Sequence, residues 1–230
     1  MKPVLEVEHL EFSYDSRRAV LHDISFTVFE GECVGILGAN GAGKSTLLWC
    51  LLRLLDARGS VRFFGEKLTK SAMARIGVVF QNPEDQLFMP RLIEEISLPL
   101  INLGVAKPVA VERALKALEQ VLLREAAERS ASQLSLGERK RAAIAAALAG
   151  SPDLLMLDEP TAELDGRAVR QLSGVLRELR MARLIASHDL AFLKDQAQRV
   201  VVLFEGQIIA EGASQQILSD EALLDRAGLI

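Results

Sequence analysis

The chain has 230 residues, of which 50% are hydrophobic and 25% are charged, and this is enough for one substantial hydrophobic core. The formal net charge of −4 gives no electrostatic argument for a nucleic-acid partner. Cys33 and Cys50 are too few for a disulfide framework and favour a reducing compartment. No stretch approaches the ~18 continuous apolar residues of a membrane span, and the charged N-terminus is unlike a signal peptide. We therefore expect a globular protein that is soluble by itself.

Alternating apolar and polar residues predict β-structure at the start of the chain. Residues 4–14 (VLEVEHLEFSY) and 22–32 (HDISFTVFEGE) alternate as half-buried strands do. The apolar run at 33–38 (CVGILG) is typical of a strand buried on both faces, and 44–55 has the length and composition of a buried helix. Further strands are expected at 60–65, 75–80, 153–158, 183–188 and 199–212, the last being a hairpin around Gly206.

The segment between Gln81 and Gly150 has helical periodicity instead. Apolar residues recur at helical spacing in 90–100 and 109–123, and a connection with Gly and Pro separates the two stretches. We interpret the segment as a helical insert in an α/β core. The predicted domain is single, and it comprises a core at 1–81 and 151–230 with the insert at 82–150.

The stretch LSLGERKRAAIAAAL, residues 134–148, has an unusual helix start. Ser135 and Glu138 form an S-x-x-E capping box. Gly137 nevertheless lies within the first turn, where glycine costs roughly 1 kcal/mol relative to alanine. This combination indicates that something must approach the backbone closely at this point.

A phosphate-binding motif lies between the strand at 33–38 and the helix at 44–55. GANGAGKS, residues 38–45, matches G-x-x-x-x-G-K-[ST] in the context that the motif requires, so a tight glycine turn without a ligand is disfavoured. Backbone N–H groups and the helix start would face the phosphates, Lys44 adds a full positive charge, and Ser45 can hold Mg²⁺. The predicted nucleotide contacts here are Gly38, Ala39, Asn40, Gly41, Ala42, Gly43, Lys44, Ser45 and Thr46.

Two acidic residues end the predicted strand at 153–158. Asp158 suits coordination of Mg²⁺, and Glu159 is placed to polarise an attacking water. Without the phosphate loop they would be solvated acids before Pro160. With that loop, the pair indicates a metal ligand and a general base.

The phosphate loop, LSLGE and LDEP occur in this order, and together they make the chain resemble the ATPase subunit of an ABC transporter over essentially its whole length. The resemblance implies an α/β P-loop NTPase core with an N-terminal antiparallel β subdomain and an inserted helical subdomain. It also implies an ATP hydrolase with ATP and Mg²⁺ as cofactors. Ser135 and Gly137 then belong to the ABC signature, which binds the γ-phosphate of ATP held by a second ATPase subunit in a head-to-tail homodimer or heterodimer. The approach expected at Gly137 is accordingly that of a partner's nucleotide.

The resemblance assigns further residues one by one. Tyr14 resembles the aromatic that stacks on adenine, although a strand tyrosine is often a packing residue. Gln81 resembles the glutamine that approaches Mg²⁺ and the attacking water, but alone it would be an ordinary strand-end residue. His188 resembles the switch histidine at the γ-phosphate, but alone it would be a helix cap or surface residue. Asp165 resembles the aspartate of the loop that crosses the dimer interface. The implied catalytic residues are Glu159, His188 and Gln81, and the implied metal ligands are Ser45, Gln81 and Asp158.

Three positions depart from the family pattern. Glu163 replaces a small residue, and Leu136 and Glu138 replace the second-position glycine and the terminal glutamine of the commonest signature. The main hydrogen-bond donors that would bind a phosphate anion are retained. These three departures leave the rate of ATP turnover open.

The run QNPEDQLF, residues 81–88, resembles the ATPases of energy-coupling factor importers, which take up vitamins or transition-metal ions. The resemblance implies a groove for an integral membrane transporter subunit, with Leu87, Phe88 and Met89 either contacting that subunit or packing in the core. It implies a cytoplasmic protein, peripheral on the inner face of the cell membrane, with no nucleic-acid partner. The longer C-terminal dimerisation extension of many relatives is not expected, so dimerisation would depend more on ATP or on the membrane partner.

Two alternative functions remain open. The ATPase of an exporter or lipoprotein-release system would share all the catalytic motifs, and only the QNPEDQLF resemblance opposes it. A nucleotide-dependent switch in DNA repair or translation would carry a long coiled coil or two fused ATPase cores, and we find neither in this sequence.

Overall fold

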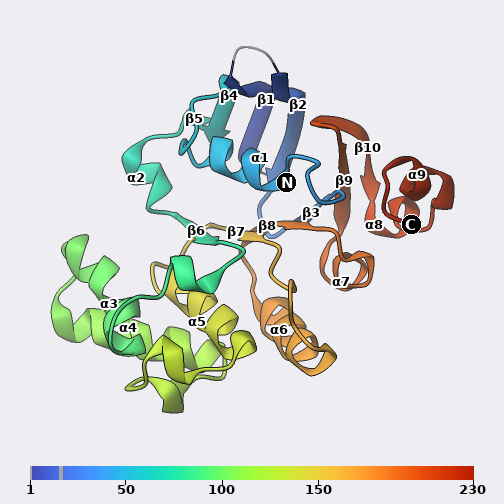
Figure 1. The fold of residues 1–230 in the computed structure, drawn as a ribbon. Coiled ribbons are helices and arrows are strands. Elements are labelled where there is room, and N and C mark those ends of the chain that lie inside the picture. Colours follow the sequence, from blue (N-terminus) through green and yellow to red (C-terminus); the bar gives the residue numbers. More distant parts are fainter. Residues whose placement is uncertain (1, 16–17) are drawn as a thin grey trace.

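The computed structural model describes residues 2–15 and 18–230, which form two β-sheets and the helices around them (Figure 1). The first sheet is antiparallel, with the strand order β2-β1-β4-β5. Its strands are β1 (Pro3–Asp15), β2 (Arg18–Phe29), β4 (Arg58–Phe63) and β5 (Glu66–Lys67).

The second sheet lies at the centre of the molecule and has the order β10-β9-β3-β8-β7-β6. Five of its strands are parallel, and β10 pairs antiparallel with β9. Every residue of β3 and β7 is buried, as their continuous apolar runs predict. The strands are β3 (Cys33–Leu37), β6 (Ile76–Val79), β7 (Leu154–Asp158), β8 (Ala182–Ser187), β9 (Arg199–Phe204) and β10 (Gln207–Ala213).

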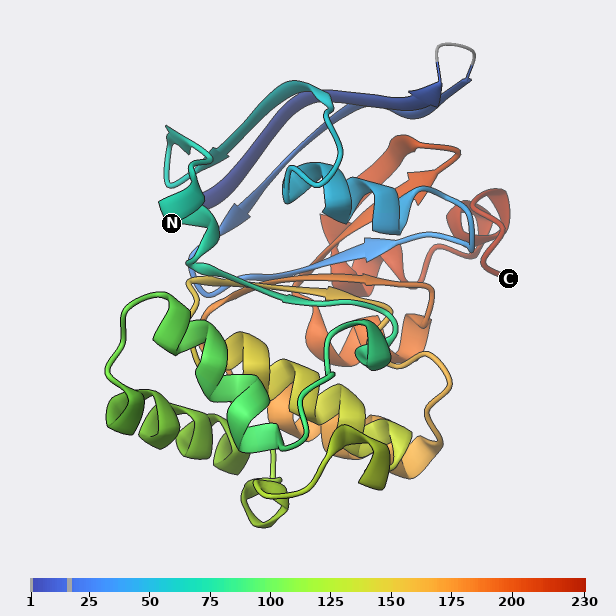
Figure 2. The same cartoon turned by 60° about the vertical axis from the view of Figure 1, so that its left-hand side comes forward.

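Helix α1 (Lys44–Leu51) lies between the two sheets, whereas the longer helices α3 to α6 lie on the opposite side of the central sheet (Figure 2). The remaining helices are α2 (Lys70–Met73), α3 (Leu92–Asn102), α4 (Lys107–Gln120), α5 (Leu136–Leu148), α6 (Gly166–Glu178), α7 (Leu190–Gln196), α8 (Ser214–Ile217) and α9 (Glu221–Arg226). Short 3₁₀ turns occur at Pro83–Asp85, Arg124–Ala126 and Ala131–Gln133. Within the described residues, no helix is both long enough and apolar enough to span a bilayer.

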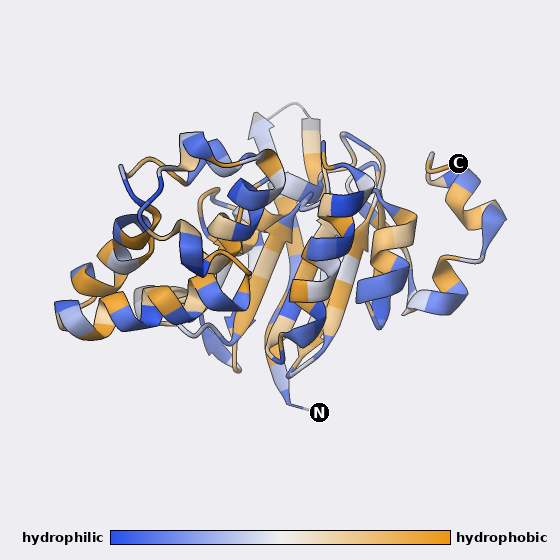
Figure 3. Ribbon diagram, turned by 90° about the horizontal axis from the view of Figure 1, so that it is seen from below, coloured by the Kyte–Doolittle hydropathy of each residue, from blue (hydrophilic) through white to orange (hydrophobic). Residues whose placement is uncertain are grey.

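The apolar side chains form two clusters, one on each face of the central sheet. Val34 and Ile36 of β3 pack with α1 and the antiparallel sheet, whereas Cys33 and Leu37 pack with the helices on the other face. Figure 3 shows hydrophobic residues running along the strands, while the helices alternate between hydrophobic and hydrophilic residues. The nucleotide loop after β3 therefore starts from a strand that is fixed on both sides.

The predicted α/β class is confirmed, with an antiparallel N-terminal sheet and the helices α3 to α5 inserted between β6 and β7. The expected strands are present, and the hairpin turns at Gly206 with a φ of 75°. The insert shares one apolar cluster with strand β7 and helix α6, so it has no separate core of its own. The boundaries at 82–150 accordingly stay a prediction.

Several details differ from the expectations, of which three bear on the helices. The helix predicted at 44–55 ends at Leu51. Pro108 lies in the first turn of α4 instead of in the connection, because proline is tolerated there. Helix α6 was not predicted at all, although its apolar residues Leu172, Val175 and Leu176 are spaced for one buried face.

Candidate functional site

The loop between β3 and α1 borders a pocket of about 360 Å³. Gly43 precedes α1 with a φ of 104°, a left-handed conformation that glycine adopts without strain. A Cβ on Gly38 would lie 2.6 Å from the carbonyl oxygen of Leu203, so β9 leaves no space for a side chain there. The pocket is lined by Val20, Asn40, Gly41, Gly43, Lys44, Ser45, Thr46, Gln81 and Glu159.

Lys44 is almost completely buried, and its ammonium group contacts both the loop and a carboxylate. Nζ donates hydrogen bonds to the carbonyl oxygens of Gly38 at 2.7 Å and Ala39 at 3.1 Å. It also lies 3.0 Å from Glu159 Oε1, and both side chains are 6% exposed. Oε1 makes no hydrogen bond among the described residues, so this contact is an ion pair alone. The positive charge of the pocket is thus compensated by Glu159.

Glu159 follows β7 directly, and its other carboxylate oxygen faces β8. Oε2 lies 3.0 Å from His188 Nδ1 and accepts longer hydrogen bonds from the Ser187 hydroxyl and the His188 N–H, at 3.3 and 3.4 Å. The structure therefore brings Glu159, His188 and Lys44 together, as the sequence predicts. Their catalytic roles stay a prediction.

Asp158 ends β7 and is 3% exposed. Burial raises the pKa of its carboxyl group, and the hydrogen bond from the Ser45 hydroxyl opposes that shift. Oδ1 has no hydrogen-bond partner among the described residues, and an orphaned buried carboxylate oxygen is costly unless something satisfies it. Ser45 and Gln81 add neutral oxygen atoms at the adjoining pocket, and Mg²⁺ prefers oxygen ligands. The residues present fit Mg²⁺.

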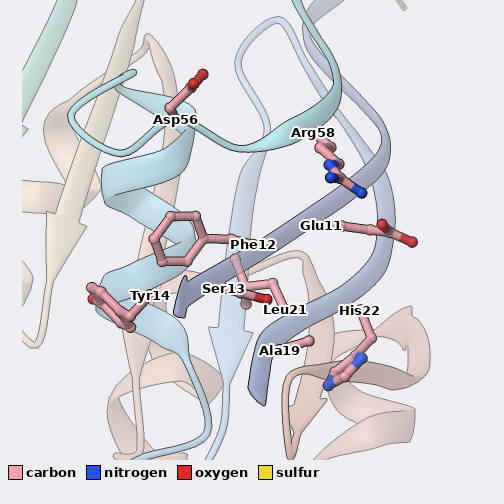
Figure 4. A pocket seen from close by; sticks show the side chains of 9 residues that line it. All are labelled: Glu11, Phe12, Ser13, Tyr14, Ala19, Leu21, His22, Asp56 and Arg58. Carbon is pink, nitrogen blue, oxygen red and sulfur yellow. The ribbon is translucent and has the colours of Figure 1, made fainter. Parts of the chain in front are cut away.

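Tyr14 lies beside this pocket with 59% of its surface exposed. Its hydroxyl lies 3.3 Å from Thr46 Oγ1, and its ring packs edge-on against Phe12. A further pocket of about 570 Å³ adjoins the ring on the antiparallel sheet (Figure 4). An exposed aromatic ring can stack on a planar base, so the geometry permits the predicted adenine contact.

Ser135, Gly137 and Asp165 line a different pocket, of about 310 Å³, which does not include Lys44. Ser135 N donates to Glu138 Oε2 at 2.8 Å, and Glu138 N donates to Ser135 Oγ at 3.3 Å, which confirms the predicted capping box. Asp165 caps α6 in a similar way. The predicted nucleotide residues therefore fall into two separate groups within one chain.

The packing of the chain itself explains why residue 137 is a glycine. A Cβ at this position would lie 2.9 Å from the Cβ of Ala168 on α6. The sequence interpretation, which attributed the bare backbone to a partner's nucleotide, is incomplete, because the close packing of α5 against α6 already requires glycine. A contact with phosphate stays a prediction.

Two side chains that the sequence analysis did not single out hold the QNPEDQLF run. The side-chain amide of Gln86 makes hydrogen bonds of 2.8 and 3.0 Å with the backbone at the end of β6, in the manner of an added strand. Glu95 is buried, and its Oε2 accepts the N–H groups of Phe88 and Met89 at 2.7 and 2.6 Å. A glutamate at helical spacing among apolar residues gives no sequence signal for this role.

The two interpretations of 87–89 apply to different residues. Leu87 is 7% exposed and belongs to the apolar cluster, so it packs in the core. Phe88 is 75% exposed, and Met89 lines a groove of about 530 Å³ between α3 and α4. Of these three residues, Phe88 and Met89 are therefore the ones that a partner can reach.

Comparisons with known proteins agree with this geometry. A family model described as ABC transporter matches residues 21–162. The energy-coupling factor transporter ATP-binding protein EcfA of Carboxydothermus hydrogenoformans is 38% identical, with 100% of this chain and 87% of that protein covered. A Gloeobacter violaceus protein named as an ABC transporter ATP-binding protein is 43% identical, with 98% and 95% covered. The solved structure of cbiO1 from Clostridium perfringens, described as part of the ABC transporter complex cbiONQ, has a TM-score of 0.87 at 29% identity, with 100% and 96% covered.

The chain belongs to the ABC transporter family and is an ATP-binding subunit with ATP hydrolase activity. The resemblance stated from the phosphate loop, LSLGE and LDEP is confirmed.

Proposed function

We propose that the chain powers an importer of the energy-coupling factor type, which takes up a vitamin or a metal ion through a separate membrane subunit. The observation that carries this proposal is the course of the QNPEDQLF run. Gln81 at its start lines the nucleotide pocket, whereas Phe88 at its end is exposed. A change at the nucleotide is therefore only seven residues from a surface that a partner can contact. The relatives named EcfA support the same assignment.

In the proposed hydrolysis, the backbone N–H groups of 38–46 and the Lys44 ammonium bind the β- and γ-phosphates. Ser45, Asp158 and Gln81 would hold Mg²⁺, which supplies charge neutralisation at the phosphate oxygens when bound. Glu159 Oε1 makes no hydrogen bond and is paired with Lys44, so once the ammonium group binds the phosphates this oxygen would be free to orient a water and accept its proton. His188 Nδ1 lies 3.0 Å from the other carboxylate oxygen, and the proposal gives the His188 side chain the contact with the γ-phosphate.

A second subunit completes the proposed site. Ser135, Gly137 and Asp165 line their own pocket, so one chain presents two incomplete halves. A head-to-tail pair would place the α5 start of each subunit against the ATP of the other, where its N–H groups suit a phosphate anion. We further propose that the ATPase pair sits on the inner face of the cell membrane, bound to the membrane subunit.

The test is reconstitution. The tagged chain would be purified in detergent from membranes of its host together with any integral membrane protein that remains bound, and the complex would be placed in vesicles. The proposal expects ATP on the ATPase side to drive substrate across the membrane toward that side, and expects Lys44→Ala to stop it. Transport in the opposite direction would assign the chain to an exporter, and the absence of any membrane protein would favour a switch protein.

A further inference from the structure

Lys140 is a buried cation on helix α5 that the proposed hydrolysis leaves unused. Lys140 is only 3% exposed, and this burial lowers the pKa of its ammonium group. Among residues 2–15 and 18–230, no carboxylate lies within ion-pair distance of its Nζ. A buried ammonium group without an ion-pair partner is unfavourable unless it makes good hydrogen bonds. Its position therefore calls for a specific contact.

That contact is the backbone of Glu159. Lys140 Nζ donates a hydrogen bond of 3.0 Å to the carbonyl oxygen of Glu159, and the Ala162 N–H donates a second one at 3.1 Å. On the other side, the Glu159 N–H donates to Ala186 at 2.9 Å and continues the pairing of β7 with β8. Both polar groups of the Glu159 backbone are thus held.

The backbone of Glu159 needs this support because its conformation is unfavourable. Its φ is +43°, which lies in the left-handed region that side chains other than glycine rarely adopt. Such residues persist only where surrounding contacts hold them, and they tend to occur at functional sites. The following residue is Pro160, which has no N–H group to contribute. The carbonyl oxygen is therefore where an external hydrogen bond can hold this turn.

We propose that Lys140 is a positioning residue, whose ammonium group holds the Glu159 backbone so that the carboxylate faces the nucleotide pocket. This inference rests on the proposed role of Glu159 as the general base. Lys44 contacts the carboxylate and Lys140 contacts the carbonyl, so two buried cations fix opposite ends of one residue. Lys140 touches neither the nucleotide pocket nor its contents and acts through Glu159 alone.

The test is a double-mutant cycle on the purified chain. Lys140→Met removes the donor and keeps a similar length, and replacing a buried charge with an apolar side chain need not destabilise a protein. A small displacement of a reacting group costs up to about 100-fold in rate, so kcat should fall by about 10- to 100-fold. The Kd for MgATP should change by less than about twofold, because the phosphate contacts are untouched. In the Glu159→Gln background, Lys140→Met should cause no further loss.

Arg183→Met is the matched control. Arg183 is also a buried cation that donates to a backbone carbonyl, that of Leu176, and it lines neither of the two predicted nucleotide pockets. Arg183→Met should leave kcat unchanged, and its melting temperature shows what the loss of a buried cation alone does to stability. Lys140→Gln keeps a shorter N–H donor and should retain an intermediate kcat; it replaces Lys140→Met in the cycle if the methionine variant does not fold.

The possible outcomes distinguish the positioning role of Lys140 from the proposed role of Glu159 as the general base. A Lys140 variant with wild-type kcat, or a loss that multiplies with that of Glu159→Gln, would overturn the positioning role. A Glu159→Gln protein that hydrolyses ATP at the normal rate would instead overturn the proposed function of Glu159 itself.

Discussion

The Lys44–Glu159 ion pair is the central feature at the scale of single residues. The two charged atoms lie 3.0 Å apart and both side chains are buried, so water screens the attraction weakly. In the proposed site, an ATP phosphate would compete with Glu159 for the same ammonium group and would also meet the negative charge of the carboxylate. The affinity for ATP would therefore depend on how much more strongly Lys44 attracts the phosphate than it attracts Glu159.

Lys44→Ala and Glu159→Gln should change ATP affinity in opposite directions. Removing the lysine deletes a charged hydrogen-bond donor worth about 1.5–3 kcal/mol, so the Kd should rise by roughly 10- to 100-fold. Glu159→Gln removes the competing charge, so its Kd should be equal to or lower than that of the wild type. Calorimetric titration with ATP measures both, and Glu178→Gln, at an exposed position of α6, is the control for the amide substitution. Weaker ATP binding by Glu159→Gln would contradict the proposed competition.

At the scale of elements, the start of α5 combines a helix cap with the predicted phosphate contact. Glu138 accepts hydrogen bonds from the Ser135 N–H at 2.8 Å and from the Ser135 hydroxyl at 2.9 Å. These hydrogen bonds lower the pKa of the Glu138 carboxyl group. The carboxylate form is therefore tied to the folded helix start.

Glu138 should contribute a pH-dependent part of the free energy of unfolding. Its pKa is lower in the folded chain, so the contribution is present above the ordinary carboxyl pKa and is lost as the pH falls through the folded value. Urea unfolding of the wild type and Glu138→Gln should differ most near pH 7, and the difference should shrink only as the pH falls below the ordinary carboxyl pKa toward the lower folded value. Ser135→Ala should cost about 1 kcal/mol near pH 7. If the difference in free energy of unfolding between the two proteins does not depend on pH, the ionised Glu138 side chain does not stabilise the helix start.

Substitutions of the neighbours Leu87 and Phe88 should have different effects, the first on stability and the second on assembly with the membrane subunit. Leu87→Ala opens a cavity in the apolar cluster and should lower the free energy of unfolding by about 2–5 kcal/mol. Phe88→Ala changes an exposed residue, so stability should stay within about 0.5 kcal/mol, while retention of the membrane subunit should weaken. Thermal or urea unfolding and pull-down would be measured on one preparation. Full pull-down by Phe88→Ala would remove this residue from the proposed contact surface.

The strands and the nucleotide loop could be predicted from the sequence because their signals are local. The apolar run at 33–38 carries the signal for the strand, and the glycines and the lysine of residues 38–45 carry the signal for the loop. Lys140 could not be predicted, since ERKR has the composition of a solvated helix face and its burial depends on where α5 meets β7. Gly137 likewise required the structure, because the Ala168 Cβ that crowds it belongs to another helix.

At the scale of the whole molecule, the Lys44 pocket lies at the loop that follows β3 of the central sheet, while the starts of α5 and α6 line the Ser135 pocket. One chain therefore has two pockets that its own fold does not bring together. In the proposed function, a second subunit in the head-to-tail arrangement completes both, so that each ATP bound at one Lys44 pocket is contacted by the other subunit only in the closed pair. Ligand binding of this kind stabilises the dimer by mass action.

The most direct measurement is the mass of Glu159→Gln in solution, by gel filtration with light scattering, with and without ATP. Because this variant should bind ATP without turning it over, we expect monomers without ATP and dimers with it. Adding Ser135→Asp keeps an acceptor for the Glu138 N–H but loses the hydroxyl that donates to the Glu138 carboxylate, and it places a negative charge where the partner's γ-phosphate would lie. The double variant should bind ATP and remain monomeric. Dimers of the double variant at the same ATP concentration would contradict the account.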